Sequence, residues 1–335
     1  MAYSAKYDST GVERYTIPSF TFQSGESIPI RIAYRSYNPS ASKKFCIPTC
    51  YGGLINATLA FNSSEGALAS YHVIVVAMLG NGESSSPSNT PDFPKKIDYR
   101  DQVHAQHEIL SAHFRIEQLD GVLGFSMGGQ QAYYWACMYT DFVKNAIVIA
   151  SSAQTSGHNY AFLTGPVAAL ENSTDYADGQ YRSKGMVPSR GLKAFGHAYC
   201  AWLTSTAWFR EQQYQKLGFD NVAEYVDNQS KTMLEGWDAE DALILAKMWQ
   251  AGDIGVFADG DLGKALAGIK CNVLVMPART DQYFPPEDSE IEVKHLQLGE
   301  LAVIETVWGH IAGGGANAED TAWMDGRIAK FLNKG

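Results

Sequence analysis

The sequence predicts an α/β fold in which a mostly parallel central sheet is flanked by helices and interrupted by an inserted helical cap. Short apolar runs alternate with helical patterns up to residue 152 and again from residue 269. Such alternation is typical of βαβ units, whose strands are parallel. Residues 153–268 contain helical patterns, turns and many aromatic residues, but no convincing strand. We therefore expect a core of residues 1–152 and 269–335, with residues 153–268 as the cap.

The composition and net charge of the chain argue against some classes of function. The chain has 335 residues, of which 45% are hydrophobic, enough to bury a large core. Its net charge of -10 argues against nucleic acid as a partner. No apolar run approaches the roughly 20 residues of a membrane span, and the first eight residues lack the apolar centre of a signal peptide. We expect no membrane partner and a cytoplasmic location.

The individual elements follow from local patterns. Alternating apolar residues across 18–36 predict an antiparallel hairpin at the edge of the sheet. Residues 80–94 form a polar loop behind a central strand, which suits either a linker or a wall of the active site. The other expected strands are 44–50, 72–78, 121–125, 145–150, 271–276 and 301–307, and the expected core helices are 98–114, 130–143 and 320–332.

The stretch from Gly121 to Gly129 organises the rest of the chain. An apolar strand runs into Gly-x-Ser-x-Gly, with Ser126 at its centre, and then into a helix. This is the nucleophile elbow of the α/β-hydrolase fold, a sharp strand-to-helix turn that exposes the serine hydroxyl. A Cβ at position 124 or 128 would crowd the turn. Ser126 is therefore the candidate nucleophile.

A serine nucleophile needs a base to accept its proton and a carboxylate to orient that base. In this fold the chain order is serine, acid, histidine. Asp281 lies in a turn behind the strand that ends near residue 276, and His310 lies in a glycine-rich loop behind the last strand. We predict Asp281 as the acid and His310 as the base. Asp288 is the rival acid, in an acidic group that we otherwise expect to be solvated surface: Glu287, Asp288, Glu290 and Glu292.

The histidines before the elbow do not predict a metal site. His104 and His107 are three residues apart, and His113 follows, but the His-Glu-x-x-His pattern of zinc hydrolases is absent. A solvated helix face explains them, so we expect no metal.

The oxyanion hole should consist of two backbone amides. One is the NH of Met127, the residue after the nucleophile, and the other belongs to the loop after the third strand. We assign the second to Tyr51, because Gly52 and Gly53 behind it let the chain turn its amide inward. The same two glycines are expected to contact substrate.

Several motifs together resemble the homoserine O-acetyltransferase branch of the α/β-hydrolase superfamily. The elbow Gly-Phe-Ser-Met-Gly-Gly-Gln-Gln at 124–131 is similar to that branch's elbow, and Tyr-Arg-Asp-Gln-Val at 99–103 to the start of its preceding helix. Thr280-Asp281 with Phe-Pro-Pro at 284–286 resembles its acid loop, and Gly309-His310 its histidine loop. The resemblance implies acyl-serine chemistry on a small molecule, acetyl-CoA or another acyl-CoA as co-substrate of a transferase, no other cofactor, and a homodimer formed through the helical cap.

Two departures argue against homoserine itself as the substrate. Residues 82–87 read Gly-Glu-Ser-Ser-Ser-Pro where the branch tends to have Gly-Ser-Thr-Gly-Pro. Residues 193–197 lack the arginine that would suit an amino-acid carboxylate. Aromatic residues of the cap suit either a larger, less charged substrate or the cap's own core: Tyr199, Trp202, Trp208 and Phe209.

Three functions stay open. The leading hypothesis is hydrolysis of an ester or similar acyl group through an acyl-Ser126 intermediate, with water as acceptor. The second is acyl transfer from an acyl-CoA to an alcohol, and both use the same three side chains. The third is a non-catalytic ligand-binding protein on the same fold. The intact set of Ser126, Asp281 and His310 argues against the third hypothesis.

Overall fold

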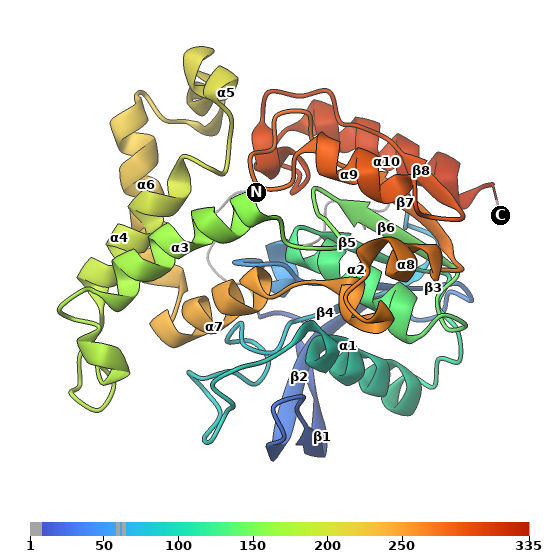
Figure 1. Ribbon diagram of the computed structural model, residues 1–335, viewed down its shortest axis with the longest axis horizontal. Helices are drawn as coiled ribbons and strands as arrows, with labels where there is room; N and C mark the ends of the chain where they lie inside the picture. The colour runs from blue at the N-terminus through green and yellow to red at the C-terminus, as the bar shows by residue number, and fades with distance from the viewer. Residues whose placement is uncertain (1–8, 58–60, 62–64, 335) are drawn as a thin grey trace.

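The computed structural model describes residues 9–57, 61 and 65–334, and in this part of the chain one sheet of eight strands forms the centre (Figure 1). The strand order is β1-β2-β4-β3-β5-β6-β7-β8. The β1–β2 and β2–β4 pairs are antiparallel, and all pairs from β4 to β8 are parallel. The predicted fold class is confirmed. The strands are β1 (Glu13–Thr21), β2 (Ser27–Tyr37), β3 (Lys44–Pro48), β4 (His72–Val76), β5 (Gly121–Phe125), β6 (Asn145–Ile149), β7 (Asn272–Met276) and β8 (Gly299–Leu301).

Helices cover this sheet, and strands β5, β6 and β7 run between α1 and α10 in the view of Figure 1. Every residue of β4 and β5 is buried, as expected for strands covered on both faces. The helices are α1 (Tyr99–Glu108), α2 (Met127–Met138), α3 (Gly157–Glu171), α4 (Ser189–Cys200), α5 (Thr206–Arg210), α6 (Val222–Gly236), α7 (Ala239–Gln250), α8 (Leu262–Ala267), α9 (Pro286–Val293) and α10 (Ala318–Leu332).

Helix α1 begins with a capping box. The Asp98 side chain accepts the Arg100 NH, and the Asp101 carboxylate accepts the Asp98 NH. Asp101 also accepts the Gln23 NH at 2.7 Å, which joins the helix to the β1–β2 hairpin. Burial raises the pKa of Asp101 to about 6. Beyond Glu108 the helix continues as a π-helical turn to His113.

Two expected elements have different bounds. The helix expected at 130–143 is α2, which starts directly after Ser126 and ends at Met138, because Tyr139 leaves helical geometry with φ -129° and ψ 58°. The strand expected at 301–307 is β8, which ends at Leu301 and adds only an isolated bridge between Ile304 and Ala278. Beyond that bridge, Thr306 makes other bonds: its hydroxyl donates to Asp320 and its carbonyl accepts from Thr280.

The segment between β6 and β7 is helical. Helices α3 to α6 gather at one side of the molecule, whereas α8 lies near α2 against the core (Figure 1). The only β pairing of this segment that the described residues show is an isolated bridge between Gln154 and Asp253. No helix in the described ranges is long and apolar enough to span a membrane. The eight N-terminal residues considered for a signal peptide lie outside those ranges.

The 80–94 loop is bonded to its neighbours on both sides. Ser84 and Ser85 accept the backbone NH groups of Ala33 and Arg31 in β2 through their hydroxyls. Ser88 donates its NH, at 2.9 Å, and its hydroxyl to the carboxylate of Asp241 in α7. The loop therefore connects the sheet to the helical segment and does not line the cavity described below.

Candidate active site

The elbow holds Ser126 in a strained conformation. Its φ of 56° and ψ of -125° lie in a region that residues other than glycine rarely adopt, as a nucleophile elbow requires. The two flanking positions must be glycine because a side chain at either one would clash with nearby backbone. A Cβ on Gly124 would lie 1.9 Å from the Gly128 carbonyl oxygen, and one on Gly128 would lie 2.9 Å from the Pro48 carbonyl oxygen. The serine NH donates to Ile149 in β6, which fixes the turn to the sheet.

The structure brings Ser126, His310 and Asp281 into one hydrogen-bonded chain. His310 Nε2 lies 2.9 Å from Ser126 Oγ, and His310 Nδ1 lies 2.7 Å from Asp281 Oδ2. Because a carboxylate can only accept, Nδ1 carries the proton and Nε2 is free to accept from the serine. The His310 side chain is 5% exposed and that of Asp281 is fully buried. This arrangement can transfer the serine proton to the imidazole.

The Asp281 carboxylate is oriented by its own turn. Its other oxygen, Oδ1, accepts the NH groups of Tyr283 at 2.7 Å and Phe284 at 3.2 Å. The rival acid, Asp288, lies in the first turn of α9 and makes no hydrogen bond to His310. Its neighbour Glu292 differs from the expected solvated surface: it is 4% exposed and accepts the Tyr133 hydroxyl and the Ala153 NH. Burial raises the pKa of Glu292 to about 8.

The histidine loop is supported by residues 203–205, in the turn after α4. Ile311 donates its NH to the Leu203 carbonyl at 3.2 Å, and the Ser205 hydroxyl donates to the Val307 carbonyl at 2.6 Å. Gly309 has a φ of 60°, and a Cβ there would lie 2.6 Å from the Thr204 backbone. The loop that carries the candidate base therefore touches backbone from the helical segment.

Among the described residues, neither of the two amides assigned to the oxyanion hole, the NH of Tyr51 and the NH of Met127, donates a hydrogen bond. Met127 is the first residue of α2, so its NH is one of the free donors of a helix start. Gly52 follows Tyr51 with a φ of 69° and lines the cavity beside Ser126. Gly53 does not line it; its NH donates to Cys50 and closes a turn.

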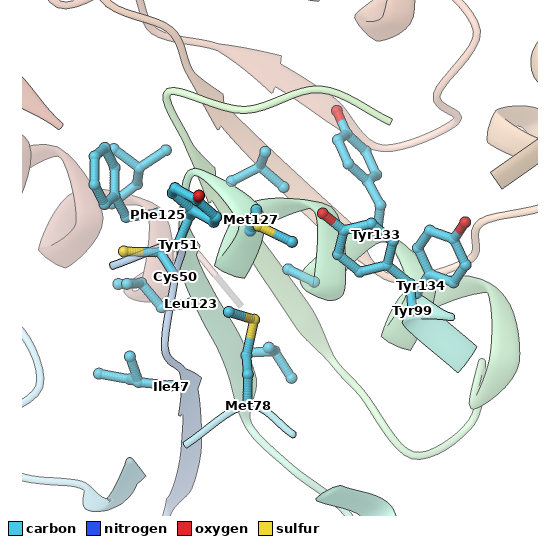
Figure 2. Packing of buried hydrophobic residues seen from close by; sticks show 14 of the residues in the cluster. Ile47, Cys50, Tyr51, Met78, Tyr99, Leu123, Phe125, Met127, Tyr133 and Tyr134 are labelled. Atoms are coloured by element: carbon cyan, nitrogen blue, oxygen red, sulfur yellow. The ribbon is translucent and has the colours of Figure 1, made fainter. Parts of the chain in front are cut away.

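The Tyr51 side chain connects this loop to the helical segment. Its hydroxyl donates to the Ala242 carbonyl in α7 at 3.1 Å, and its ring centroid lies 4.7 Å from that of Trp237. Figure 2 shows the Tyr51, Phe125 and Met127 side chains gathered at the end of β5. Burial holds the pKa of the Tyr51 phenol well above its usual range. The ring is therefore a neutral, apolar part of the site.

A cavity of about 40 Å³ opens at Ser126. By the same measure a single water needs roughly 10–15 Å³, so the cavity suits a small group. None of the described residues that line it is Lys, Arg, Asp or Glu. The lining comes from the loop at Tyr51 and Gly52, the elbow, the histidine loop, and helices α4 and α6 with the residues that follow them: Tyr51, Gly52, Phe125, Ser126, Gly196, Tyr199, Cys200, Leu203, Gln229, Thr232, Met233, Trp237 and His310.

Most of these lining residues could not be predicted from the sequence. Gln229, Thr232 and Met233 come from α6, whose helical pattern shows an apolar face but not which part of it meets Ser126. The aromatic residues of the segment divide between two roles. Tyr199 lines the cavity, whereas Trp208 is fully buried in the core.

The histidines before the elbow have partners other than a metal. His104 is hydrogen-bonded to the Tyr139 hydroxyl, and His107 stacks on the same ring at 3.9 Å. His113 bonds to the Tyr34 hydroxyl. Over the described ranges, no cluster of three or more His, Cys, Asp or Glu residues could hold a metal ion.

Comparison with known proteins places this site in a family. A model of the alpha/beta hydrolase fold matches residues 49–312, which include the elbow, the acid loop and the histidine loop. The chain belongs to the α/β-hydrolase family. Within the part of the chain compared, the elbow serine, the acid and the histidine follow one another in the order of this family.

The relatives of this α/β-hydrolase include esterases and homoserine acyltransferases. Ethyl acetate hydrolase of Pseudomonas veronii is 34% identical over 305 residues, which cover 88% of this chain and 87% of that protein. Homoserine O-acetyltransferase of Mesorhizobium japonicum is 32% identical over 259 residues, covering 71% and 66%. The structure of the acetyl esterase MekB matches with a TM-score of 0.90 at 32% identity, covering 96% of each chain. The resemblance found in the motifs is confirmed.

Proposed function

We propose that this α/β-hydrolase hydrolyses esters of short-chain acids through an acyl-Ser126 intermediate. The observation that carries the proposal is the buried Ser126–His310–Asp281 chain, which opens on a small cavity whose described lining includes no Lys, Arg, Asp or Glu. An uncharged acyl group can enter such a cavity without leaving a charge unpaired. The likeness to an ethyl acetate hydrolase and to an acetyl esterase supports esters of acetic acid as the first substrates to test.

Acylation begins when His310 Nε2 accepts the proton of Ser126 Oγ as that oxygen attacks the ester carbonyl. The carbonyl oxygen becomes an oxyanion, and we assign its binding to the Tyr51 and Met127 amides. Asp281 stabilises the imidazolium through Nδ1. Collapse of the intermediate breaks the bond to the alkoxy oxygen, and His310 returns the proton to the departing alcohol.

Deacylation repeats these steps with water. His310 takes a proton from the water as its oxygen attacks the acyl-Ser126 carbonyl, and the same two amides bind the second oxyanion. When the bond to Ser126 breaks, His310 protonates the serine oxygen. The carboxylic acid leaves, and the enzyme returns to its starting state with one water consumed.

Steady-state kinetics with an acyl-length series test the proposal. We expect the value of kcat/KM to be highest for p-nitrophenyl acetate and to fall for the butanoate and octanoate, because the cavity is small. Ethyl acetate hydrolysis, followed by acid release in a pH-stat, checks the result with an unactivated alcohol. Absence of turnover on all of these esters would refute the proposal.

Acyl transfer is the second candidate, because homoserine acyltransferases are among the relatives. Intact-protein mass spectrometry after incubation with acetyl-CoA separates the two. An acetyl adduct on Ser126 that alcohols discharge faster than water does would favour transfer. No adduct from acetyl-CoA, together with rapid turnover of acetate esters, would favour hydrolysis. Stoichiometric ligand binding without turnover would instead point to the non-catalytic alternative.

Three further expectations belong to the same proposal. We treat residues 153–268 as a cap whose α4 and α6 close the cavity over Ser126. The helical cap is also the expected contact of a homodimer, which sedimentation velocity of the purified protein would test. A cytoplasmic location completes the proposal and can be tested by cell fractionation.

A further inference from the structure

A buried glutamine in the elbow helix contacts both halves of the proposed oxyanion hole. Gln131 lies one turn after Met127 in α2 and is fully buried. Its Nε2 donates to the Thr49 carbonyl at 3.0 Å and to the Met127 carbonyl at 3.1 Å. The Thr49 carbonyl belongs to the peptide unit next to the one that carries the Tyr51 NH. The Met127 carbonyl likewise belongs to the peptide unit next to the one that carries the Met127 NH.

We infer that Gln131 is a positioning residue, which fixes the separation of the Tyr51 and Met127 amides. This inference rests on the proposed function, since it concerns the hole that would stabilise the oxyanion. Gln131 touches neither substrate nor Ser126 in this role. It acts through the backbone of two neighbouring elements, the end of β3 and the start of α2.

The sheet alone does not fix this part of β3. Its pairing with β5 covers only Phe45 and Cys46, whereas its pairing with β4 continues to Pro48. The chain beyond is held from the β4 side, where the Thr49 NH donates to Val76. On the β5 side, the Gln131 amide takes the place of the missing strand partner. Without it, the described hydrogen bonds of Thr49 would come from the β4 side alone, through Val76 and Met78.

The orientation of the Gln131 amide is set by a buried relay. The Trp135 indole NH, which can only donate, lies 2.8 Å from Gln106 Oε1. Gln106 therefore presents its nitrogen to Gln131 Oε1, at 2.6 Å. With its oxygen occupied in this way, Gln131 must direct Nε2 at the two carbonyls. Each hydrogen bond in this series thus has one allowed direction. The last donor, Gln131 Nε2, points at the Thr49 and Met127 carbonyls.

The neighbouring Gln130 provides a matched control. It lies on the same helix, is also fully buried, and makes side-chain hydrogen bonds of its own, to Tyr99 and Thr155. These partners do not adjoin the oxyanion amides. Gln130→Met and Gln131→Met therefore remove comparable buried hydrogen bonds, but only the second change removes the tie between Thr49 and Met127.

The two variants should differ in their values of kcat. We expect Gln131→Met to lower kcat on p-nitrophenyl acetate by about 10- to 100-fold, with KM changed by less than about threefold, because misplacement by a fraction of an ångström weakens transition-state binding. Gln130→Met should keep kcat within about threefold of the wild type. Equal kcat values for the two variants would overturn the inference.

A second measurement separates positioning from general loss of structure. Ethylboronic acid forms a tetrahedral adduct with an active-site serine, and one of its oxygens would occupy the oxyanion hole. Gln131→Met should weaken its inhibition by about as much as it lowers kcat, since both report binding of the tetrahedral state. Unchanged inhibition would contradict the inference. Should Gln131→Met fail to fold, Gln131→Glu, which keeps the shape but loses the Nε2 donor, takes its place.

Failure of the proposed function would look different. In that case Ser126→Ala would retain turnover of the acetate esters, whatever the result at Gln131. If Ser126→Ala is inactive and Gln131→Met retains its kcat, the proposed function stands and only the positioning role is lost.

Discussion

The two sides of Ser126 are built in different ways. On the sheet side, the contacts are made by backbone groups and by short polar side chains whose geometry is fixed by hydrogen bonds. On the side of the helical segment, α4 and α6 line the cavity with uncharged side chains, among them Tyr199, Cys200 and Met233. Under the proposed function, the sheet side should control the rate of the chemical step, and the helical side should control which acyl groups fit.

The largest expected effect is on the sheet side, at the candidate nucleophile. Ser126→Ala should lower kcat/KM for acetate esters by several orders of magnitude, as loss of a triad member typically does. The fold should persist, since the hydroxyl is small. Initial rates and circular dichroism check both points. Ser152→Ala is the control, a buried serine whose hydroxyl donates to the Gln154 carbonyl. Near-normal activity of Ser126→Ala would remove the nucleophile assignment.

The second-largest effect on kcat is expected from a backbone change in the loop at Tyr51, Gly52 and Gly53. Gly53 does not line the cavity, but a Cβ there would lie 2.7 Å from Cys50 Sγ and 3.2 Å from the Cys50 nitrogen. Gly53→Val should therefore shift the Tyr51 amide and lower kcat by about 10- to 100-fold, with a smaller effect on KM. Gly157→Ala, in open space, is the control. A rise in KM with an unchanged kcat would show that the loop binds substrate rather than the transition state.

On the helical side, a change should alter selectivity more than rate. Met233 lines the cavity, and Met233→Ala should raise the butanoate-to-acetate ratio of kcat/KM by about tenfold, since room for extra methylenes is worth about 1–3 kcal/mol. Met248→Ala, buried in α7 away from the cavity, should cost similar stability without changing the ratio. The comparison of the two sides fails if both variants shift the ratio equally.

The last expected effect concerns stability and leaves the rate of the chemical step aside. Glu292 has a folded-state pKa of about 8, raised from 4.5 by burial. Between these two pKa values, the folded protein keeps a proton that the unfolded chain has released. The stabilisation that protonated Glu292 contributes is therefore complete below pH 4.5 and is lost as pH rises toward 8. Each unit of such a shift corresponds to about 1.4 kcal/mol.

Thermal denaturation across this pH range tests the assignment. The melting temperature of Glu292→Gln should fall less steeply with rising pH than that of the wild type, because the amide is neutral throughout. The exposed Glu290, in the same helix, gives the control Glu290→Gln, which should follow the wild-type slope. Parallel curves for wild type and Glu292→Gln would rule out Glu292 as the group that loses its proton.

The sequence predicted the sheet side better than the helical side, for a physical reason. The elbow is a local structure: its glycines and Ser126 are adjacent in the chain and are required by contacts within a few residues. Asp281 and His310 could be placed because parallel strands end at one edge of the sheet. The cavity lining could not, because it depends on how α4 packs against α6. Gln131 was missed for the same reason, since its partner Thr49 is distant in sequence.

The turn after α4 has a consequence for engineering. Leu203, Thr204 and Ser205 contact the loop that carries His310 through main-chain atoms and one hydroxyl, so this loop rests partly on the segment between β6 and β7. A chimera that exchanged residues 153–268 for those of a relative would replace this seat together with the cavity walls. Grafting selectivity from one esterase to another should therefore succeed more often when these three residues are left in place and only α6 is exchanged.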